Sequence, residues 1–536
     1  MEKTNPSEEV EKASPVSLSG SSSSSSKSEI ALPLTDNHHR PPSASPQDDF
    51  TIVSFEPNDR ANPHNWSTKT KSLIFLTAVL STTTTSFSST LPSNFAPSLP
   101  TIFALPDPSG PQRVLPASLY LAGFVFGPLA WAPLSESPRV GRWRVLVTGA
   151  ALFVVMCLGQ AVVREGDWAG FLVLRFLAGV VGSPPVSVFG GVIADLFEGE
   201  VERGRVMMWW SAAAFVGPLG APILAGFVSI ELGWRAVFWI ALSFAVASFI
   251  AVLLMPETLA STILRRKAER LNKELSNTGK QFVAPSDVER ESAWVAYKTT
   301  LSRPWRLLFG EMVVSLSCAY LGFVYAVFYM LLQIFPRIFQ GVYGFTPGMS
   351  GILFTIMGLG TILGCFILTW YDGIAPRLGS RNPTKREEYL RLPPVCAAGP
   401  LYVVSMLWLG WSARPDVHWL VPLWSMVPYG LAYHLIYVAI INYVTDAYGI
   451  YSASALAAMS MTRSVAGTLL PLAIEDMVDG LGIAWSCTVL AGVSAGLALV
   501  PFGFIAYGEK IRAASRFSAA LKPGAGQDRE GASGSG

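Results

Sequence analysis

The chain has 536 residues, of which 51% are hydrophobic and only 14% are charged. Soluble globular proteins carry about 25% charged residues, so the composition argues against a water-soluble enzyme of this length. The net charge is +2 and the basic residues are scattered among loops, so we expect no nucleic-acid partner. Because about 20 apolar residues cross a bilayer as a helix, the composition predicts an all-α polytopic membrane protein.

Twelve apolar stretches have spanning length and fall into two groups of six. The first six are Ser72–Phe95, Leu115–Leu134, Val145–Val163, Trp168–Ile193, Val206–Val228 and Ala236–Met255. The second six are Trp305–Phe335, Met349–Tyr371, Pro394–Trp411, Trp419–Val444, Ala453–Ala473 and Ile483–Tyr507. The seventh stretch is longer than a bilayer needs, so we expect it to be tilted or extended. The pattern predicts twelve transmembrane helices in two six-helix halves.

An even number of spans places both ends of the chain on one side of the membrane. Of the 39 lysines and arginines, 32 lie in the tails and loops of that side and five in the opposite loops. Positive charge marks the cytoplasmic side, so both termini are expected there. The spans predict five regions: a tail over 1–65, a bundle over 66–255, a linker over 256–304, a bundle over 305–507 and a tail over 508–536.

Two of these regions are polar. The first tail is rich in proline and serine and is expected to be disordered. The linker contains Ile263–Leu271, whose basic and apolar residues predict an amphipathic helix. This helix is expected either to lie on the anionic inner leaflet or to be a solvated connector.

Acidic residues occupy equivalent places in the two halves, at the inner ends of the second and fourth spans. They are Glu136 and Asp195 in the first half, and Asp372 and Asp446 in the second. With Arg142, the first pair is expected to form a charge cluster that holds the inner side shut and breaks on opening. Ordinary positive-inside charges are the alternative. An ion pair at a wet interface contributes about 0–1 kcal/mol, which biases such an equilibrium without locking it.

Several short motifs point together to one family. They are Asn62-Pro-His-Asn-Trp66, Gly127-Pro-Leu-Ala-Trp-Ala-Pro-Leu-Ser-Glu136 with Gly141-Arg142, Arg175-Phe-Leu-Ala-Gly-Val-Val-Gly-Ser183-Pro184-Pro185, Gly217-Pro218-Leu-Gly220-Ala-Pro222-Ile-Leu-Ala-Gly226 and Pro256-Glu-Thr258. Over about Asn62 to Phe517 the chain resembles the major facilitator superfamily, and within it the fungal twelve-span drug:proton antiporters. It departs from the usual pattern at Ala132, where the family has glycine, and at Trp143, where it has arginine.

The resemblance implies a proton-coupled exporter of drugs or secondary metabolites in the plasma membrane, working as a monomer. The segment Gly217–Gly226 matches the antiporter motif, which is implied to seal the outer side, and tight helix packing by its glycines is the alternative. A proton-coupled importer of an organic acid or a sugar is the alternative function. No P-loop, nucleophile elbow or metal cluster is present, so we expect a proton gradient as the energy source, no cofactor and no enzymatic activity.

Four ionisable residues lie within the spans: Arg175, Glu311, His434 and Arg463. Charge inside a bilayer is unfavourable, so each should face a cavity or a partner. The resemblance implies a coupling role for Arg175, with bonds to backbone or tyrosine hydroxyls as the alternative, and Arg463 is a similar case. Glu311 and His434 are the candidate proton carriers, although a packing role is the alternative for the histidine.

Aromatic side chains are expected to line an apolar pocket between the halves, near the middle of the membrane. The tyrosine pairs of the seventh and tenth spans are each four residues apart and therefore share a helix face. The wall candidates are Tyr120, Trp209, Phe215, Tyr325, Tyr329, Tyr433 and Tyr437. For any one of them core packing is the alternative. Because acids are scarce within the spans, a neutral or anionic amphipathic molecule is favoured over a polyamine or a divalent cation.

Overall fold

The computed structural model describes residues 50–105, 111–275, 281–288, 293–379, 391–448 and 452–514. Of the predicted tails over 1–65 and 508–536, residues 1–49 and 515–536 lie outside these ranges. The helices of the N-terminal half are α1 (Thr68–Thr90), α3 (Leu115–Glu136), α4 (Arg142–Val162), α5 (Trp168–Gly182), α6 (Pro184–Leu196), α7 (Glu200–Glu231) and α8 (Trp234–Leu253). Those of the C-terminal half are α11 (Ala293–Gly310), α12 (Met312–Pro336), α13 (Pro347–Leu353), α14 (Thr355–Gly379), α16 (Pro393–Ser412), α17 (Leu420–Trp424), α18 (Met426–Tyr448), α19 (Ser452–Leu469), α20 (Ile474–Leu497) and α21 (Val500–Ala514).

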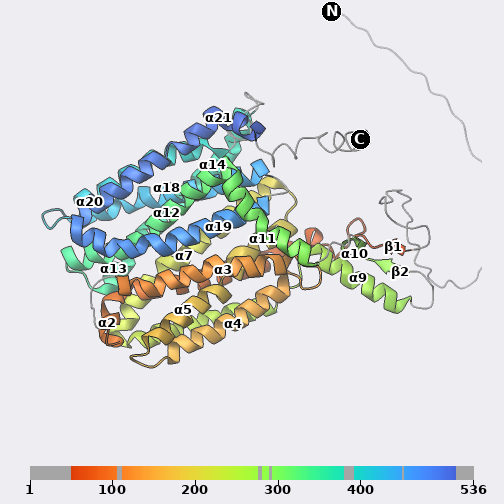
Figure 1. The fold of residues 1–536 in the computed structure, drawn as a ribbon, viewed down its shortest axis with the longest axis horizontal. Helices are drawn as coiled ribbons and strands as arrows, with labels where there is room; N and C mark the ends of the chain where they lie inside the picture. Colours follow the sequence, from red (N-terminus) through yellow and green to blue (C-terminus); the bar gives the residue numbers. More distant parts are fainter. Residues whose placement is uncertain are drawn as a thin grey trace, which may run out of the picture. The chain divides into compact units, whose positions relative to one another are not determined.

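Short elements complete the described chain. They are β1 (Phe50–Ile52), η1 (Pro63–Asn65), η2 (Leu91–Asn94), η3 (Ala96–Ser98), α2 (Leu99–Ile102), η4 (Pro111–Arg113), α9 (Ala260–Glu274), β2 (Gln281–Val283), α10 (Pro285–Val288), η5 (Arg337–Val342) and η8 (Leu470–Ala473). We call the end of the bundle nearest to α9 of the linker the linker end, and the opposite end the far end (Figure 1).

Ten helical segments of the described chain are long and apolar enough to cross a membrane. Nine coincide with the second to tenth predicted spans, and the tenth, Ser454–Gly508, is 55 residues long and covers the last two. Helix α1 coincides with the first predicted span but is not among the ten, because serine and threonine dilute its apolar residues. The all-helical membrane fold is therefore confirmed, whereas the number twelve stays a prediction.

Helices pack in the same pairs in the two halves. In the N-terminal half α3 packs along α5, α1 along α7 and α4 along α8. In the C-terminal half α14 packs along α18, α12 along α19 and α16 along α20. The halves meet where α7 packs on α13 and α14. They also meet where α19 packs on α3, and Figure 1 shows these two helices side by side. Such a repeated pattern is expected of two units related by an axis along the membrane normal.

The predicted seventh span is two helices and not one long helix. Helices α11 and α12 are separated at Glu311, whose backbone is extended, with φ −121° and ψ 110°. Gly310 precedes it, and glycine weakens a helix because its backbone has more freedom to lose. In the fourth span Ser183 separates α5 from α6, where Pro184 and Pro185 supply no backbone N–H.

The linker helix α9 has an apolar face that the chain itself covers. Strand β1, which precedes α1, pairs in parallel with β2 of the linker. Val53, Ala268 and Ala284 form a small buried core there. The predicted amphipathic helix is present, and part of its apolar face packs on protein. The structure differs from the expected disorder in residues 50–65, which contain β1 and η1.

An ion pair joins the same two segments. Lys267 of α9 lies 2.9 Å from the Asp59 carboxylate, between β1 and η1. The hydrogen bond from Lys267 holds the pKa of Asp59 below its usual range. The N-terminal segment is thus attached to the linker both by an apolar contact and by a charged one.

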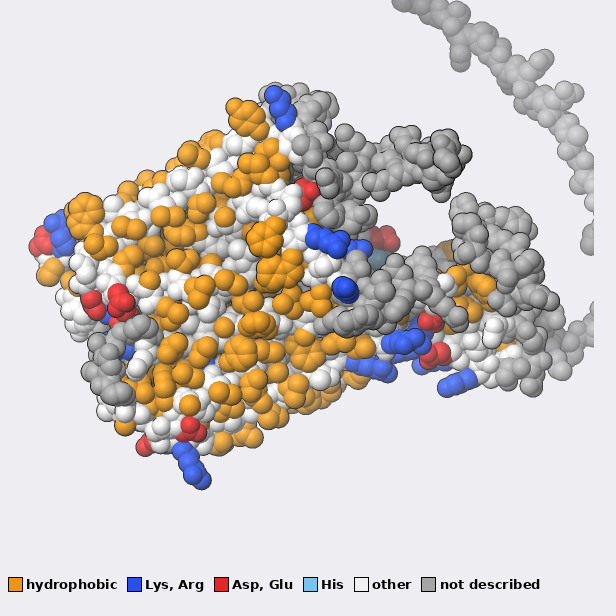
Figure 2. Space-filling model, viewed as in Figure 1, with side chains coloured by type: hydrophobic (Ala, Val, Ile, Leu, Met, Phe, Trp, Pro, Cys, Tyr) orange, Lys and Arg blue, Asp and Glu red, His pale blue; other side chains and the backbone are white. Residues whose placement is uncertain are grey.

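The side of the bundle is apolar. Figure 2 shows hydrophobic side chains over the face in view, with charged side chains gathered at its ends. Large apolar side chains are exposed on the bundle, for example Phe309 (78%), Leu254 (74%) and Trp370 (67%). Soluble monomers rarely expose large continuous apolar patches, so this is the surface that lipid covers.

Candidate functional site

Arg175 lies on α5 and is fully buried against α1 and α3. Its Nε donates to the carbonyl of Pro116 at 2.9 Å. Its terminal nitrogens donate to the carbonyls of Ser88 at 2.7 Å and Ser89 at 2.8 Å. The guanidinium also lies 4.7 Å from the centre of the Tyr120 ring. Nη1 also donates to the amide oxygen of Gln160 at 3.4 Å. Backbone carbonyls, this amide and an aromatic face therefore hold the charge, and within the described residues no carboxylate forms an ion pair with it.

The carbonyls that bind Arg175 include one that α1 cannot satisfy itself. Pro92 follows α1 in η2 and has no N–H. The carbonyl of Ser88, four residues earlier, therefore lacks its helical hydrogen bond. A cation at the C-terminal end of a helix is also favoured by the helix dipole. Arg175 thus caps α1.

Arg463 lies on α19 of the C-terminal half and is 7% exposed. Its Nη1 donates to the Tyr437 hydroxyl, and its Nη2 to Ser460 Oγ at 3.5 Å. The guanidinium lies over the rings of Tyr325 at 4.9 Å and Tyr437 at 5.3 Å. Its Nε has no hydrogen-bond partner. Arg463 therefore keeps a donor that no described protein group uses.

Five of the predicted wall residues gather where the halves meet. The ring of Phe215 on α7 lies 4.3 Å from that of Tyr433 on α18, centre to centre. On α12 the rings of Tyr325 and Tyr329 lie 5.0 Å apart, and on α18 Tyr433 stacks on Tyr437 at 6.2 Å. The Tyr433 hydroxyl is buried without a partner. We call these five residues the aromatic cluster.

Polar contacts connect the two buried arginines through this cluster. The Ser89 carbonyl accepts from Arg175, and its hydroxyl is 3.0 Å from the Tyr329 hydroxyl. The Tyr325 hydroxyl donates to that of Tyr329 at 3.4 Å, and the Tyr325 ring faces Arg463. Arg175 and Arg463 thus contact one polar layer from opposite halves.

The two remaining wall candidates lie elsewhere. Trp209 of α7 is 42% exposed, and its ring meets that of Phe366, which is 60% exposed on α14. Tyr120 lies inside the N-terminal half, facing Arg175, and donates to the carbonyl of Thr85 at 2.9 Å. Trp209 therefore belongs to the exposed side of the bundle, and Tyr120 to the surroundings of Arg175.

The two candidate proton carriers have different surroundings. Glu311 is 5% exposed at the joint between α11 and α12, and accepts from the Tyr448 hydroxyl of α18 at 3.1 Å. His434 is 1% exposed within the C-terminal half, where its Nε2 lies 3.3 Å from Cys365 Sγ. The Nδ1 of His434 has no partner. The structure thus keeps both groups buried, Glu311 against Tyr448 and His434 against Cys365 of α14.

At the linker end of the N-terminal half, Arg142 lies 2.7 Å from Asp195 in an ion pair, with a second contact at 3.1 Å. Glu136, the third predicted member, is exposed and within electrostatic range of Arg142 and of Arg303 from α11. Glu257 was not predicted. Its carboxylate accepts from the backbone N–H of Arg142 at 3.0 Å and so caps α4. In the sequence, only the Pro256-Glu-Thr258 motif marks this residue.

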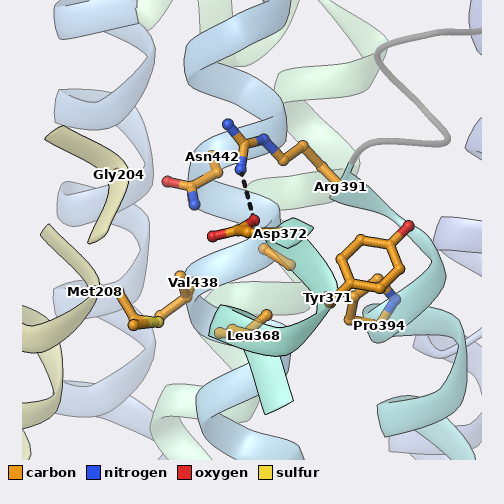
Figure 3. A pocket seen from close by; sticks show the side chains of 10 residues that line it. Gly204, Met208, Leu368, Tyr371, Asp372, Arg391, Pro394, Val438 and Asn442 are labelled. Atoms are coloured by element: carbon orange, nitrogen blue, oxygen red, sulfur yellow. Dashed lines mark ion pairs between the residues drawn. The ribbon is translucent and has the colours of Figure 1, made fainter. Parts of the chain in front are cut away.

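The C-terminal half has a matching cluster around Arg391, which the sequence patterns did not indicate. Arg391, just before α16, lies 2.7 Å from Asp446 and 3.5 Å from Asp372. Figure 3 shows Arg391 and Asp372 facing each other with Asn442 beside them. Arg205 of α7 acts on Asp372 electrostatically from the other half. In each half an arginine at the start of the third span binds the acid of the fourth.

A small pocket lies beside the Arg391 cluster, between α7 of one half and α14 and α18 of the other (Figure 3). Its lining residues are Gly204, Met208, Leu368, Tyr371, Asp372, Arg391, Pro394, Val438, Ala439 and Asn442. The charged cluster of the C-terminal half therefore borders a gap between the halves.

The predicted antiporter segment forms the far-end part of α7. Gly217 lies against the backbone of α1, where an added Cβ would come within 2.8 Å of the Phe87 nitrogen. The carbonyl of Pro218 accepts from the Thr90 hydroxyl at 3.2 Å. Gly220 borders open space and Gly226 is buried. The first part of the segment thus packs within its own half.

The same segment also contacts the other half. The carbonyl of Pro222 lies where a Cβ on Gly351 of α13 would come within 2.6 Å. The ring of Phe227 covers Gly348 in the same way, at 2.7 Å. These two glycines were not predicted, although they begin the eighth span as Pro347-Gly-Met-Ser-Gly351. At the far end, α7 and α13 are therefore in backbone contact.

An ion network at the far end also joins the halves and was not predicted. Arg337, after α12, binds Glu475 and, at 2.5 Å, Asp479 of α20. Arg113, which precedes α3 in the N-terminal half, lies 4.0 Å from Glu475. Glu475 is thus shared by cations of both halves.

Comparison with known proteins identifies the family to which the chain belongs. Residues 73–471 match the family model of the Major Facilitator Superfamily. The chain belongs to this superfamily. It is 34% identical over 470 residues to the efflux pump FUBT of Fusarium oxysporum, which covers 87% of this chain and 77% of that protein. It is 33% identical to the major facilitator superfamily multidrug transporter mdrA of Aspergillus fumigatus, covering 89% and 77%. It is 32% identical to the efflux pump radE of Floropilus chiversii, covering 88% and 87%.

Solved structures of the superfamily have the same fold. A D-xylose-proton symporter has a TM-score of 0.59 and 16% identity, covering 81% of this chain and 97% of that chain. The partially occluded inward-open xylose transporter XylE of E. coli has a TM-score of 0.59 and 17% identity, covering 81% and 99%. Identity this low shows the fold alone. With its efflux-pump relatives, the chain is a multi-pass membrane transporter of the superfamily and not an enzyme.

Proposed function

We propose that this transporter exports small amphipathic organic molecules, neutral or anionic, in exchange for protons, by alternating access. The observation that carries the proposal is the aromatic cluster with Arg463, buried where the halves meet. The ion pair of Arg113 and Glu475 joins the halves on the far-end side of this cluster. The ion pair of Arg391 and Asp372 lies on its linker-end side, within the C-terminal half. In two-repeat transporters the cargo site lies at this level between the halves. The efflux-pump relatives support the direction of transport.

Charged groups that act on each other across the halves supply contacts that differ between the two states. Opening of the linker end separates Glu136 and Asp372 from cations of the opposite half. Opening of the far end separates Arg113 from Glu475, and α7 from α13. A solvent-exposed pair contributes about 0–1 kcal/mol, so the exposed charges bias the equilibrium without locking either state.

For the proton we propose Glu311, with His434 as the second candidate. Glu311 is buried and bonds a tyrosine hydroxyl, so a proton can bind without breaking an ion pair. For Arg175 we propose the positioning role that its carbonyl contacts support. Arg463 has a free donor and faces the aromatic cluster, and we propose that it contacts the cargo.

The distribution of basic residues indicates the orientation in the membrane. Basic residues concentrate in the tails and in the loops of the linker end, so we propose that this end faces the cytoplasm. We propose the plasma membrane as the location and a monomer as the working unit. The proton gradient supplies the energy, and no cofactor takes part.

The test uses proteoliposomes that expose the linker end outward and a panel of amphipathic compounds. Antiport predicts accumulation when the lumen is acidic, and its loss when an uncoupler removes the gradient. Accumulation that the uncoupler leaves unchanged would refute antiport. Accumulation only with an alkaline lumen would favour the importer, because cargo and proton would then enter together.

The proton carrier is tested in the same vesicles. Glu311→Gln should lower gradient-driven accumulation at least tenfold while exchange of unlabelled for labelled cargo continues. Asp416→Asn, which removes an exposed carboxylate at the far end, is the matched control and should change neither rate. Normal accumulation by Glu311→Gln would direct attention to His434.

A further inference from the structure

We infer that Arg463, with Tyr325 and Tyr437, forms a subsite for the carboxylate of a transported organic acid that has an apolar or aromatic body. The inference rests on the proposed function, which leaves the cargo either neutral or anionic. It assigns the negative charge to one end of the cargo and names the group that binds it.

Arg463 has unused hydrogen-bonding capacity. A guanidinium carries five N–H donors in a planar fork that matches a carboxylate with two parallel bonds. Two nitrogens of Arg463 bond to Tyr437 and Ser460, and Nε bonds to nothing described. A buried donor without a partner is unfavourable. Its presence in a side chain that is 7% exposed points to a partner that comes and goes.

The charge of Arg463 also lacks a counterion. The groups acting on it electrostatically are the phenols of Tyr325, Tyr433 and Tyr437. Arg142 and Arg391, by contrast, each lie 2.7 Å from an aspartate. A cation inside a membrane protein is expected to pair with an anion. Because no described carboxylate of the chain pairs with Arg463, an anion from the cargo would complete the site.

The aromatic cluster supplies ring faces on which the apolar body would pack. Tyr433 stacks on Tyr437 with 10° between the ring planes, and its buried hydroxyl has no partner. Phe215, from the opposite half, lies 4.3 Å from Tyr433. An acid bound to Arg463 would therefore touch both halves. A ligand with different contacts in two states shifts the equilibrium between them, so cargo binding there can drive the change of access.

The test measures binding without transport, in lipid nanodiscs, with two probes of equal shape. Biphenyl-4-carboxylate carries the charge, and biphenyl-4-carboxamide does not. Titrated by tryptophan fluorescence, the wild-type protein should bind the carboxylate at least tenfold more tightly, or about 1.4 kcal/mol. Arg463→Gln should remove the preference and leave carboxamide binding within threefold of the wild type.

Two further variants keep the result decisive. Arg414→Gln removes an exposed arginine at the far end and should keep the full preference. If Arg463→Gln fails to give a monodisperse protein, Arg463→Lys serves instead, because it keeps the charge but loses the fork. The lysine variant should lose at least threefold of the preference.

The outcomes separate this inference from the proposed function. Equal binding of the two probes by the wild type, binding of neither, or full preference in the Arg463 variants overturns the carboxylate subsite. Gradient-driven export of neutral compounds would then still support the proposed function. Conversely, a carboxylate preference that depends on Arg463, in a protein that accumulates no compound under any pH gradient, would keep the subsite and refute antiport.

Discussion

Arg175 and Arg463 are the two arginines that are buried within the described helices, one in each half, yet their surroundings differ. Arg175 binds three backbone carbonyls and, at 3.4 Å, the amide oxygen of Gln160, so most of its partners belong to the backbone. Arg463 binds side-chain hydroxyls and keeps its Nε free. The contrast teaches that burial of a charge does not by itself identify a transport residue. What decides the role is whether the protein already uses all the donors.

The largest expected effect distinguishes the two arginines by stability. Arg175→Ala removes a fully buried guanidinium and leaves the Ser88 carbonyl without its donor. An unpaired buried carbonyl alone is unfavourable by about 1–3 kcal/mol, so we expect little monodisperse protein and a large loss of melting temperature. Arg463→Gln should change the melting temperature by only a few degrees, because it removes an unpaired buried charge along with its bonds. Yield and melting temperature in detergent measure both. Equal losses for the two variants would contradict the comparison.

The capping role of Arg175 gives a sharper test through Pro92. Pro92→Ala restores the N–H that the Ser88 carbonyl lacks, so part of the need for Arg175 disappears. The loss caused by Arg175→Ala should therefore be smaller in the Pro92→Ala background, with a coupling energy of about 1 kcal/mol. Additive changes in the melting temperature across the four proteins would argue against capping.

These two predictions also show what the sequence could and could not indicate. If residues 88–92 are helical, the proline four residues after Ser88 leaves the Ser88 carbonyl without its helical hydrogen bond, and the sequence alone shows this. That Arg175 reaches it depends on how α5 packs on α1 and α3, which no local pattern contains. The spans themselves were predictable, because a run of apolar residues is a local property. The break at Glu311 was not, since one extended residue leaves the run apolar.

The clusters at the linker end repeat this lesson. The acids Glu136, Asp195, Asp372 and Asp446 were recognisable from their equivalent places at the ends of spans. Arg391 was not, because Asp372 and Asp446 converge on it only when three helices pack together. Trp209 is exposed and its ring meets that of Phe366. An aromatic residue within a span does not show whether its side of the helix meets lipid or the other half.

Arg142 and Arg391 at the linker end also differ in burial. The Arg142 side chain is 11% exposed and that of Arg391 is 21% exposed. The better buried arginine should matter more, so Arg142→Gln is expected to destabilise by about 2 kcal/mol and Arg391→Gln by about 1 kcal/mol or less. Melting temperatures in detergent give the order. A larger loss of melting temperature for Arg391→Gln than for Arg142→Gln would show that burial does not decide which arginine stabilises more.

The smallest effect concerns the ion pair between Asp59 and Lys267. Its hydrogen bond holds the pKa of Asp59 below the usual value of about 4. The pair therefore stabilises the attachment of β1 above that pH, and the stabilisation is lost as the pH falls through the lowered pKa. We expect amide exchange at Phe50–Val53, corrected for its intrinsic rate, to be faster in acid. The free energy of the local opening should fall by less than about 1 kcal/mol.

Lys267→Met should produce the same increase at neutral pH and abolish the change in acid. Lys273→Met, on the same helix but outside this ion pair, is the matched control. Exchange that is independent of pH in the wild type would show that the apolar contact alone holds the segment.

The central claim, that Arg463 is open to an anionic cargo whereas Arg175 is not, is tested most directly by arginine-selective labelling. The protein in proteoliposomes is treated with hydroxyphenylglyoxal, and the modified peptides are quantified by mass spectrometry. We predict that Arg463 is labelled at least tenfold faster than Arg175, and that biphenyl-4-carboxylate, but not its carboxamide, protects Arg463. Equal labelling of the two arginines, or no protection of Arg463 by the carboxylate, would contradict the account.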